Sequence, residues 1–425
     1  MPVGSDSRAF LVFAGALALA LFVVPPRTDD LDWHLAVGRD VVREGAVPRA
    51  NRYSFTAPDQ PWIHHGWGGS VVLHLVERAG GFAALSLLAG LLFAASVTLV
   101  FLRSRSLPWT TAAALLLLAS HALKPDALAT NIAAALVWLL GDDRRSRWAP
   151  FSMPLWANVH GSFPVGLGLI AAADLGARRI PWRTAVAAVL CLTSPYGFAA
   201  FIPAWRYAFD PRLRSFLGEL GAWQPPSGAA AVVLAISVVL AIVLAVHARP
   251  RPVDAVVAAI AAIAAWLAVR HVAVFAVVAG ATVASTSSTP GSKSSRFFLV
   301  TGPALVAIVV VAFVVDPPGT PHPPFPTRLL AEPRPGRLLH PHAWGGALLA
   351  AGVPVAIDPR NDCYPPRVLD DFLSIHRGPR GLGRFVRWHR IDGALAPSGS
   401  SIDRGLRALG FQVSRESQGV VLLRR

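Results

Sequence analysis

The sequence predicts an α-helical, polytopic membrane protein with a small soluble α/β domain at its C-terminus. Of its 425 residues, 54% are hydrophobic and only 15% are charged, and the mean hydropathy is +0.50. These values are far from those of an average soluble domain. Long apolar runs alternate with short arginine-bearing loops, and hydropathy falls to a soluble level only near the C-terminus. The three observations together define the fold class.

About eleven apolar segments are candidate membrane spans, since a span needs roughly 20 apolar residues and fewer where neighbours cover its ends. The first is expected to be a retained span, because its basic flank is only Arg8 and no small-residue cleavage site precedes Pro25. The predicted spans are Phe10–Val24, Phe82–Phe101, Trp109–Leu123, Ala127–Leu140, Trp148–Val159, Phe163–Leu175, Thr184–Pro195, Ala229–Val246, Val253–Val269, Val272–Ala284 and Phe297–Val315.

Basic residues on alternate connections predict the orientation. The positive-inside rule makes these loops cytoplasmic, so a bacterial inner-membrane protein with a cytoplasmic N-terminus and a periplasmic C-terminal domain is expected. The net charge of +15 then reflects topology, and nucleic acid is not an expected partner. Cys191 and Cys363 lie in such different contexts that no disulfide between them is expected. The basic residues of the alternate loops are Arg103, Arg105, Arg144, Arg145, Arg147, Arg178, Arg179, Arg183, Arg249, Arg251, Lys293 and Arg296.

The first outer loop, residues 26–68, concentrates the unusual residues of the chain. Acids, histidines, arginines and tryptophans gather there, whereas Ala, Val and Leu dominate the next two hundred residues. Residues Asp32–Glu44 predict a short amphipathic helix on the membrane surface that ends at Gly45. Residues Asn51–Trp62 are rich in turn formers and aromatic residues, which favours an ordered loop at the interface.

The C-terminal part divides into a Pro-rich linker, residues 316–335, and a domain of residues 336–425, after a membrane domain of residues 1–315. Strands are predicted at Val353–Ile357, Gly393–Ala396, Gln412–Arg415 and Val420–Leu423, with helices at Leu369–Arg377 and Ile402–Leu409. A domain of roughly ninety residues is near the size at which independent stability is marginal. We therefore expect it to dock on the outer face of the membrane part.

Several motifs resemble those of a bacterial membrane family related to the C-class (GT-C) glycosyltransferases. The loop contains D-x-x-W-H-L-x-x-G-R from Asp30, P-x-x-N-x-x-S-F-T from Pro48 and P-W-x-x-H-x-W from Pro61. Further matches are LWANVHGSF at Leu155–Phe163, SPYG at Ser194–Gly197, Arg270-His271, WGG at Trp344–Gly346 and PVAIDPRNDCY at Pro354–Tyr364. The resemblance implies a GT-C-like fold and transfer of a sugar from a polyprenyl-phosphate carrier, with membrane lipids as the surroundings.

The chain departs from the resembled pattern at four positions. Gly66 stands where the family usually has Glu, so an outer-loop carboxylate is missing. Asp32 replaces a usual aromatic residue, Lys124-Pro125 replaces Arg-Pro, and Pro359 replaces a Gly. The lost carboxylate leaves altered or absent catalysis as an alternative.

Glycosyl transfer from a lipid phosphate needs a base for the acceptor hydroxyl and positive charge for the leaving phosphate. Asp30 is the candidate base, with Asp32 as its replacement, and His34 would share a helix face with Asp30. The alternative is that the acids only cap a helix at its positive end. No metal ligand is assigned, although His34, His64 and His65 leave a divalent metal open.

Substrate-binding candidates are spread along the chain. Each has a structural alternative, such as anchoring at the interface, hydrogen bonding between helices or snorkelling to headgroups. In the tail, Asp358, Arg360 and Asp362 follow a strand end, where ligands bind in α/β domains, and an internal Asp–Arg pair is the alternative there. The substrate-binding candidates are Arg39, His65, Trp67, Lys124, Asn158, His160, Arg270 and His271.

Three functions therefore stay open. The first is a membrane glycosyltransferase, and the second is a non-catalytic scaffold or lipid-linked-glycan binding protein. A transporter is the third and is disfavoured, because transporters bind their substrates near the middle of the membrane, whereas the polar residues here gather on one face.

Overall fold

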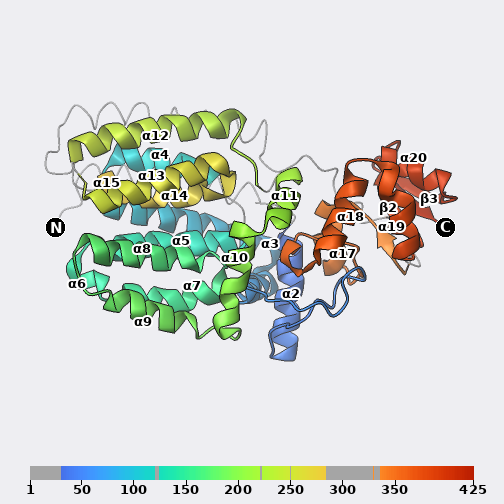
Figure 1. The fold of residues 1–425 in the computed structure, drawn as a ribbon, viewed down its shortest axis with the longest axis horizontal. Coiled ribbons are helices and arrows are strands. Elements are labelled where there is room, and N and C mark those ends of the chain that lie inside the picture. The colour runs from blue at the N-terminus through green and yellow to red at the C-terminus, as the bar shows by residue number, and fades with distance from the viewer. Residues whose placement is uncertain (1–29, 120–123, 221–222, 249, 284–328, 330–335) are drawn as a thin grey trace. The chain divides into compact units, whose positions relative to one another are not determined.

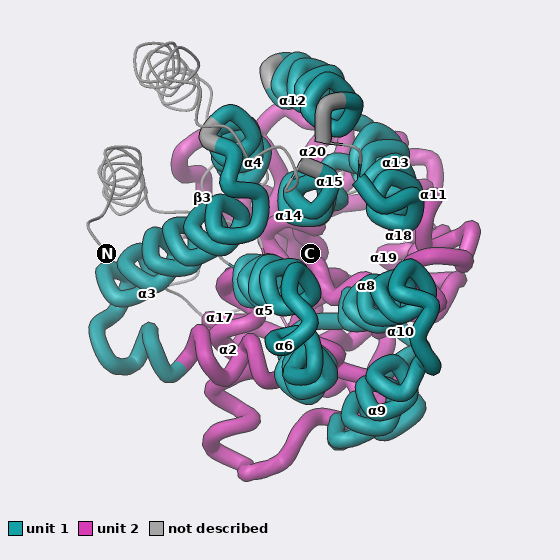
Figure 2. The backbone as a smooth tube through the Cα atoms, turned by 90° about the vertical axis from the view of Figure 1, so that its left-hand side faces the viewer, with its two compact units in different colours: residues 1–27, 75–204, 218–318 teal, residues 28–74, 205–217, 319–425 magenta. Residues whose placement is uncertain are grey.

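The computed structural model describes residues 30–119, 124–220, 223–248, 250–283, 329 and 336–425 (Figure 1). The chain divides into two compact units (Figure 2). Unit 1 comprises residues 1–27, 75–204 and 218–318, and unit 2 comprises residues 28–74, 205–217 and 319–425. The described part of unit 1 is helical, whereas unit 2 combines helices with a small sheet. The predicted combination of a helical part with a small C-terminal sheet domain is therefore confirmed.

Apolar helices build the described part of unit 1, and α3, α10 and α11 continue from one unit into the other. Short 3₁₀ turns at Ala149–Ser152, Gly197–Ala200 and Val269–His271 connect some of them. The helices are α3 (Trp67–Ser104), α4 (Leu107–Ala119), α5 (Pro125–Leu139), α6 (Asp143–Ser146), α7 (Met153–Val159), α8 (Phe163–Gly176), α9 (Trp182–Cys191), α10 (Phe201–Phe209), α11 (Pro211–Glu219), α12 (Gly228–Ala248), α13 (Pro252–Leu267), α14 (Val272–Val278) and α15 (Gly280–Val283).

One helix in the described part of the chain, α3, is long and apolar enough to cross a membrane. The other apolar helical stretches there, Ala230–Val246 of α12 among them, have 10–17 residues. The described helices therefore do not support the predicted count of about eleven spans. Turns shorten the apolar segments: Trp148–Val159 divides into a 3₁₀ turn and α7, and Val272–Ala284 divides into α14 and α15. The predicted spans Phe10–Val24 and Phe297–Val315 lie outside the described residues.

A glycine pair interrupts α3. Gly80 and Gly81 have non-helical backbone angles, and Gly81 has a φ of 59°, a conformation that glycine adopts without steric cost. The helix thus consists of two segments joined at a kink. The second segment contains the predicted span Phe82–Phe101.

Unit 2 contains the first loop of the chain together with the C-terminal domain. It has 3₁₀ turns at His342–Trp344, Asn361–Cys363 and Pro379–Gly381. Its other elements are α2 (Leu31–Glu44), β1 (Leu338–Leu339), α17 (Gly345–Ala350), α18 (Pro366–His376), α19 (Leu382–Trp388), β2 (Gly393–Pro397), α20 (Ser401–Ala408), β3 (Gln412–Ser417) and β4 (Val420–Arg424).

The sheet of unit 2 has the strand order β1-β2-β4-β3. The pair β1–β2 is parallel, and the pairs β2–β4 and β4–β3 are antiparallel. Beyond β1, Val355 forms an isolated parallel bridge with Leu338 and another with Ser54 of the first loop. The first loop therefore extends the β-structure of the C-terminal domain at the edge next to β1.

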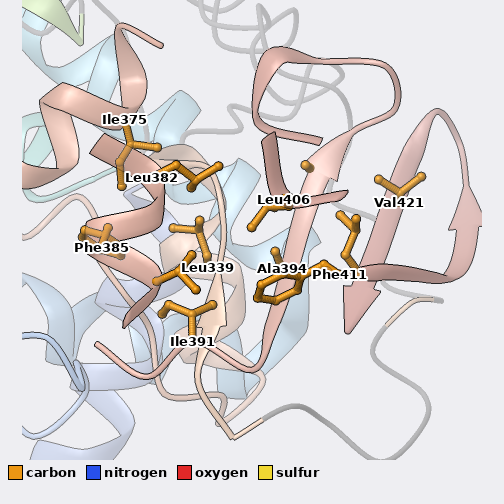
Figure 3. Packing of buried hydrophobic residues seen from close by; sticks show 12 residues of the cluster. Leu339, Ile375, Leu382, Phe385, Ile391, Ala394, Leu406, Phe411 and Val421 are labelled. Carbon is orange, nitrogen blue, oxygen red and sulfur yellow. The ribbon is translucent and has the colours of Figure 1, made fainter. Parts of the chain in front are cut away.

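Buried side chains from the helices and strands form the hydrophobic core of the C-terminal domain (Figure 3). Phe55 of the first loop packs against this core. The core residues are Leu339, Ile375, Leu382, Phe385, Val386, Ile391, Ala394, Ala396, Leu406, Phe411, Val421 and Leu423. Burial of such apolar area, at about 25 cal/mol per Å², is the main force that holds the domain together.

The predicted elements of the tail agree with the structure except near residue 355. Strands β2, β3 and β4 and helices α18 and α20 lie where the sequence predicts them, within a few residues. The predicted strand Val353–Ile357 was wrong, because only Val355 forms bridges. Of the predicted linker, residues 316–335, only Leu329 belongs to the described residues.

Candidate functional site

Helix α2 and the residue that precedes it carry the predicted catalytic residues. It ends at Gly45, as predicted, and Gly45 has the left-handed φ of 65° that favours glycine. Val37 and Val41 of α2 are buried and α2 contacts α17, while its place on the membrane surface stays a prediction. Gly38 has no room for a side chain: a Cβ there would lie 2.2 Å from the Ser70 carbonyl oxygen. This glycine lets α2 approach the first turn of α3.

Asp30 precedes α2 but does not cap it. Its side chain makes no capping hydrogen bond, and its Oδ1 accepts a hydrogen bond from Trp33 Nε1 at 3.2 Å. Asp30 therefore occupies the N-cap position without the side-chain hydrogen bond of a cap. Asp32 lies in the first helical turn, where a carboxylate interacts favourably with the helix dipole. Both acids are partly exposed.

His34 is buried in a chain of polar side chains. Its Nδ1 lies 2.7 Å from Ser70 Oγ, and His64 Nε2 lies 2.8 Å from the same oxygen. The His34 ring also stacks on Trp33 at 3.5 Å between centroids. Burial, the first cause, and the neighbouring His34 hold the pKa of His64 well below its usual range. The hydroxyl can donate to only one imidazole, so this arrangement suits neutral rings in fixed orientations.

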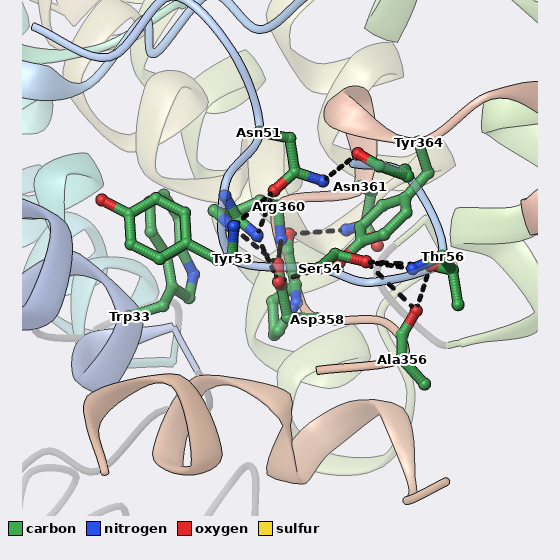
Figure 4. Close-up of polar contacts among 12 residues, drawn as sticks. Trp33, Asn51, Tyr53, Ser54, Thr56, Ala356, Asp358, Arg360, Asn361 and Tyr364 are labelled. Atoms are coloured by element: carbon green, nitrogen blue, oxygen red, sulfur yellow. Dashed lines mark hydrogen bonds and ion pairs between the residues drawn. The ribbon is translucent and has the colours of Figure 1, made fainter. Parts of the chain in front are cut away.

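Asn51 and Arg360 join the loop to the tail through buried hydrogen bonds (Figure 4). Arg360 donates from Nη2 to Asn51 Oδ1 at 3.1 Å. Asn51 donates from Nδ2 to the Ala57 carbonyl at 3.1 Å and accepts from the Tyr53 amide at 3.2 Å. Its side chain therefore fixes the loop conformation and the position of the arginine.

Asp358 and Arg360 form an internal ion pair. Arg360 donates from Nε to Oδ1 at 2.9 Å and from Nη2 to Oδ2 at 2.6 Å, and Tyr364 Oη donates to Oδ2 at 2.8 Å. The guanidinium carbon lies 4.7 Å from the ring centroids of both Tyr53 and Trp62. Both charged side chains are fully buried, so the alternative of an internal Asp–Arg pair describes this part of the tail.

Burial and charge both act on the titration of this network. Although desolvation, the largest influence, opposes the charge on each partner, the ion pair prevails: the pKa of Asp358 lies below its usual range, and that of Arg360 lies well above it. Burial raises the pKa of the Tyr364 hydroxyl and of the neighbouring Cys363 thiol well above the usual range. The network is thus a charged pair surrounded by neutral groups.

Asp362 lies close to His65, another predicted residue, and to Arg206. Its carboxylate Oδ2 is 3.6 Å from His65 Nδ1, and its carbonyl accepts a hydrogen bond from Arg206 Nη1 at 2.7 Å. His65 also meets the Tyr207 ring edge-on at 6.0 Å. Trp67 begins α3 and is partly exposed. The structure therefore joins His65 and Asp362, which are far apart in sequence.

Arg39 points to the exposed side of α2. Its Nε lies 3.8 Å from Asp40 Oδ1, and its side chain is 49% exposed. Asp40 also accepts a hydrogen bond from Tyr53 Oη at 2.9 Å and pairs with Arg43 at 3.0 Å. Arg39 therefore belongs to a charge network around the buried Asp40, and Tyr53 lies between this network and Arg360.

In unit 1, two of the predicted substrate-binding residues meet at Asp126. Its Oδ2 lies 3.7 Å from Lys124 Nζ and 3.5 Å from His160 Nε2. The Ser162 amide donates to His160 Nδ1 at 3.1 Å, so Nε2 carries the proton that faces Asp126. Arg270 adds a positive charge that acts on the same carboxylate. We name these four residues the Asp126 cluster: Lys124, Asp126, His160 and Arg270.

The other predicted residues of unit 1 have different neighbours. Asn158 donates from Nδ2 to the Pro154 carbonyl at 2.7 Å, within its own helix. His271 meets the Trp223 ring edge-on at 5.5 Å, and the Arg270 guanidinium lies 5.2 Å from the same ring. In the described residues, no group of three or more His, Cys, Asp or Glu side chains could hold a metal ion.

Sequence reasoning missed Asp126 and the role of Asn51. Asp126 follows the Lys124-Pro125 pair directly and lies in the first turn of α5, so its closeness to Lys124 was accessible from the sequence. The closeness of Asp126 to His160 was not, because 34 positions separate them. No protein-family model matches the chain, and no curated protein matches it either.

Proposed function

We propose that this protein is a membrane glycosyltransferase that takes a sugar from a polyprenyl-phosphate donor. The observation that carries the proposal is the Asp126 cluster, in which an amine, an imidazole N–H and a guanidinium gather around one carboxylate. The three cationic or proton-donating groups outnumber the single acid. Such a surplus suits a phosphate, which leaves when the glycosidic bond to the carrier breaks.

Each residue of the Asp126 cluster has a distinct role in the proposal. Lys124 and Arg270 would stabilise the charge that develops on the leaving phosphate. His160 presents its Nε2 proton and could donate it to a phosphate oxygen. Asp126 keeps the amine and the imidazole in place until the donor enters, and is therefore a positioning residue.

Asp30 is the proposed base for the acceptor hydroxyl. Its carboxylate is partly exposed and accepts a hydrogen bond from Trp33 Nε1, and a carboxylate of this kind can take a proton from a hydroxyl. Asp32, two residues further along the chain, is the second choice. His34 is hydrogen-bonded to Ser70 in a buried site, and this supports a positioning role for it in the proposal.

Membrane location belongs to the same proposal. Helix α12 exposes Val232, Ile236, Val239 and Val243 at helical spacing, each by 49% or more of its surface. An apolar face of this kind is unfavourable in water and suits lipid. We therefore propose a bacterial inner-membrane location, with several shorter helices crossing the bilayer beside α3 and with unit 2 on the periplasmic side.

Activity of purified protein tests the proposal. The full chain in detergent is given polyprenyl-phosphate sugars, and release of the sugar is followed for wild type, Lys124→Gln, His160→Gln and Asp30→Asn. Loss of a general base or acid typically lowers the rate 10²- to 10⁴-fold. Asp142→Asn, an exposed acid elsewhere in unit 1, is the matched control and should keep the wild-type rate. Wild-type-like turnover by all three variants would refute these roles.

A non-catalytic lipid-linked-glycan binding protein is the second candidate. Gly66 stands where the resembled family has Glu, and the buried residues of the tail motif serve the internal Asp358–Arg360 pair. This candidate predicts binding of the polyprenyl-phosphate sugar by wild type without turnover. Binding that needs Lys124 but never leads to sugar release would select it.

A further inference from the structure

A small cavity in unit 1 is lined by residues of α3, α5, α8, α13, α14 and α15 and of the adjoining loops. It has a volume of about 40 Å³, room for roughly three water molecules. Apolar residues of α5, α8, α13 and α14 form most of its wall, and these helices lie side by side (Figures 1 and 2). Three charged residues complete the lining: Arg103, Arg251 and Asp254.

Arg103 is shielded and lacks a partner for its Nε. This atom has almost no accessible surface and makes no hydrogen bond within the described part of the chain. A Cβ at Gly141 would lie 2.8 Å from both Cδ and Nε of Arg103, so the side chain lies directly against the backbone of Gly141. A buried guanidinium N–H without an acceptor is costly, which suggests that a group other than the described residues supplies the acceptor.

Charge in the cavity is not balanced. Asp254 forms a two-point pair with Arg251, from Nε to Oδ2 at 2.8 Å and from Nη2 to Oδ1 at 3.1 Å. This carboxylate is therefore largely used by Arg251, and two guanidinium groups with one carboxylate leave one net positive charge. Guanidinium groups bind phosphate oxygens with pairs of parallel hydrogen bonds.

We propose that this cavity binds a phosphate-bearing anion, held by Arg103 and Arg251. The site is separate from the Asp126 cluster and is independent of any glycosyl transfer. Two sources have the required chemistry, namely a phospholipid headgroup and free inorganic phosphate. The apolar residues of the wall would suit the first carbons of a lipid acyl chain.

Native mass spectrometry of the full chain distinguishes the sources. Wild type is released from micelles that contain phosphatidylglycerol or phosphatidylcholine, and retained lipid is counted. In parallel, delipidated protein is titrated with inorganic phosphate while melting is followed. Retention of phosphatidylglycerol over phosphatidylcholine would support the proposal with a lipid headgroup as source. A phosphate-dependent rise in melting temperature without lipid retention would support it with free phosphate.

Variants show whether the cavity is responsible. Arg103→Gln and Arg251→Gln should each weaken binding about tenfold, as expected for loss of a charged hydrogen bond. Arg144→Gln removes an exposed charge outside the cavity and should change nothing. Arg103→Lys keeps the positive charge but cannot form the paired hydrogen bonds of a guanidinium group, so it should give an intermediate loss of binding. This variant keeps the test valid if Arg103→Gln does not fold. Equal binding by Arg103→Lys, Arg251→Gln and Arg144→Gln, or no binding of either anion by wild type, would overturn the proposal.

Discussion

Arg360 donates a hydrogen bond to the side-chain oxygen of Asn51, although the two residues are 309 positions apart in the sequence. The bond is 3.1 Å long and lies in the interior of unit 2, where Asn51 has no exposed surface and Arg360 has 1%. The same guanidinium holds Asp358, which in turn accepts from Tyr364. The first loop and the tail are therefore parts of one folded unit.

Loss of the Arg360 charge should destabilise unit 2 strongly. Arg360→Gln would leave Asp358 buried without its counter-charge, and breaking a buried pair in this way costs about 3–5 kcal/mol. Arg367→Gln removes an exposed arginine of α18 and should change stability by less than about 0.5 kcal/mol.

Cys363 provides the measurement for this prediction. The thiol is buried and its raised pKa keeps it protonated, so it should react with a maleimide only when unit 2 opens. In a Cys191→Ser background, labelling of Arg360→Gln should be roughly 10²-fold faster than that of wild type or more. Equal labelling rates for Arg360→Gln and Arg367→Gln would show that the pair is not needed for stability.

The isolated tail should be less stable than the tail in the full chain. Residues 336–425 expressed alone lose the bonds from Phe55 N to Val355 O and from Val355 N to Tyr53 O, and also the packing of Phe55. Two such bonds contribute about 1–3 kcal/mol together. A peptide of residues 46–63 added in trans should raise the melting temperature, whereas the same peptide with Phe55→Asp should not. An equal melting temperature with and without the loop would argue against its contribution.

Unit 2 should lose stability as the pH falls from about 6.5 to about 4. His340 accepts a hydrogen bond at Nε2 from the Ala356 amide, so this nitrogen cannot also carry a proton. Burial lowers its pKa from 6.5 to about 4. In this window the unfolded chain binds a proton that the folded chain does not, so stability is present above pH 6.5 and is lost as the pH falls. The full loss is about 3 kcal/mol.

Two histidine variants isolate the effect of His340. His340→Gln can still accept from Ala356 and should show a smaller loss of stability between pH 6.5 and pH 4. His376→Gln changes an exposed histidine of the same unit and should keep the wild-type pH dependence. The comparison uses the midpoint of denaturant unfolding followed by Cys363 labelling. Parallel pH profiles for wild type and His340→Gln would exclude His340 as the source.

The first loop and the C-terminus should both be periplasmic. Cysteines introduced at Asp59, which is exposed in the loop, and at Arg425 should react in intact cells with a maleimide that cannot cross the inner membrane. A cysteine at Arg144, in a loop predicted to be cytoplasmic, should react only after the cells are opened. Reaction at Arg144 but not at Arg425 in intact cells would reverse the proposed orientation.

Local patterns predicted the elements of unit 2 well. Helix α2 and its end at Gly45 follow from hydrophobic spacing and a glycine stop, and β2 to β4 follow from short apolar runs between turns. The strand near Val355 was predicted wrongly because its partners, Leu338 and Ser54, are set by tertiary structure. Backbone pairing between segments that are far apart in the sequence cannot be predicted from the local pattern of either segment.

The candidate site was predicted only in part. The sequence identified Lys124, His160 and Arg270 as separate residues, and the structure relates all three to Asp126. The sequence also offered an internal pair for Asp358 and Arg360, which the structure contains. Asn51 could not be assigned a partner from the sequence, since its hydrogen bond depends on how the tail folds back.

In the proposed membrane location, the bridge between Ser54 and Val355 restricts how the chain can cross a bilayer. Two segments joined by backbone hydrogen bonds must lie in the same compartment. The number of crossings between Ser54 and Val355, with α3 included, must therefore be even, because an odd number would leave these two residues in different compartments. The parity of the membrane topology is thus fixed by a contact in unit 2, and a deletion that removes a single crossing should prevent this unit from assembling.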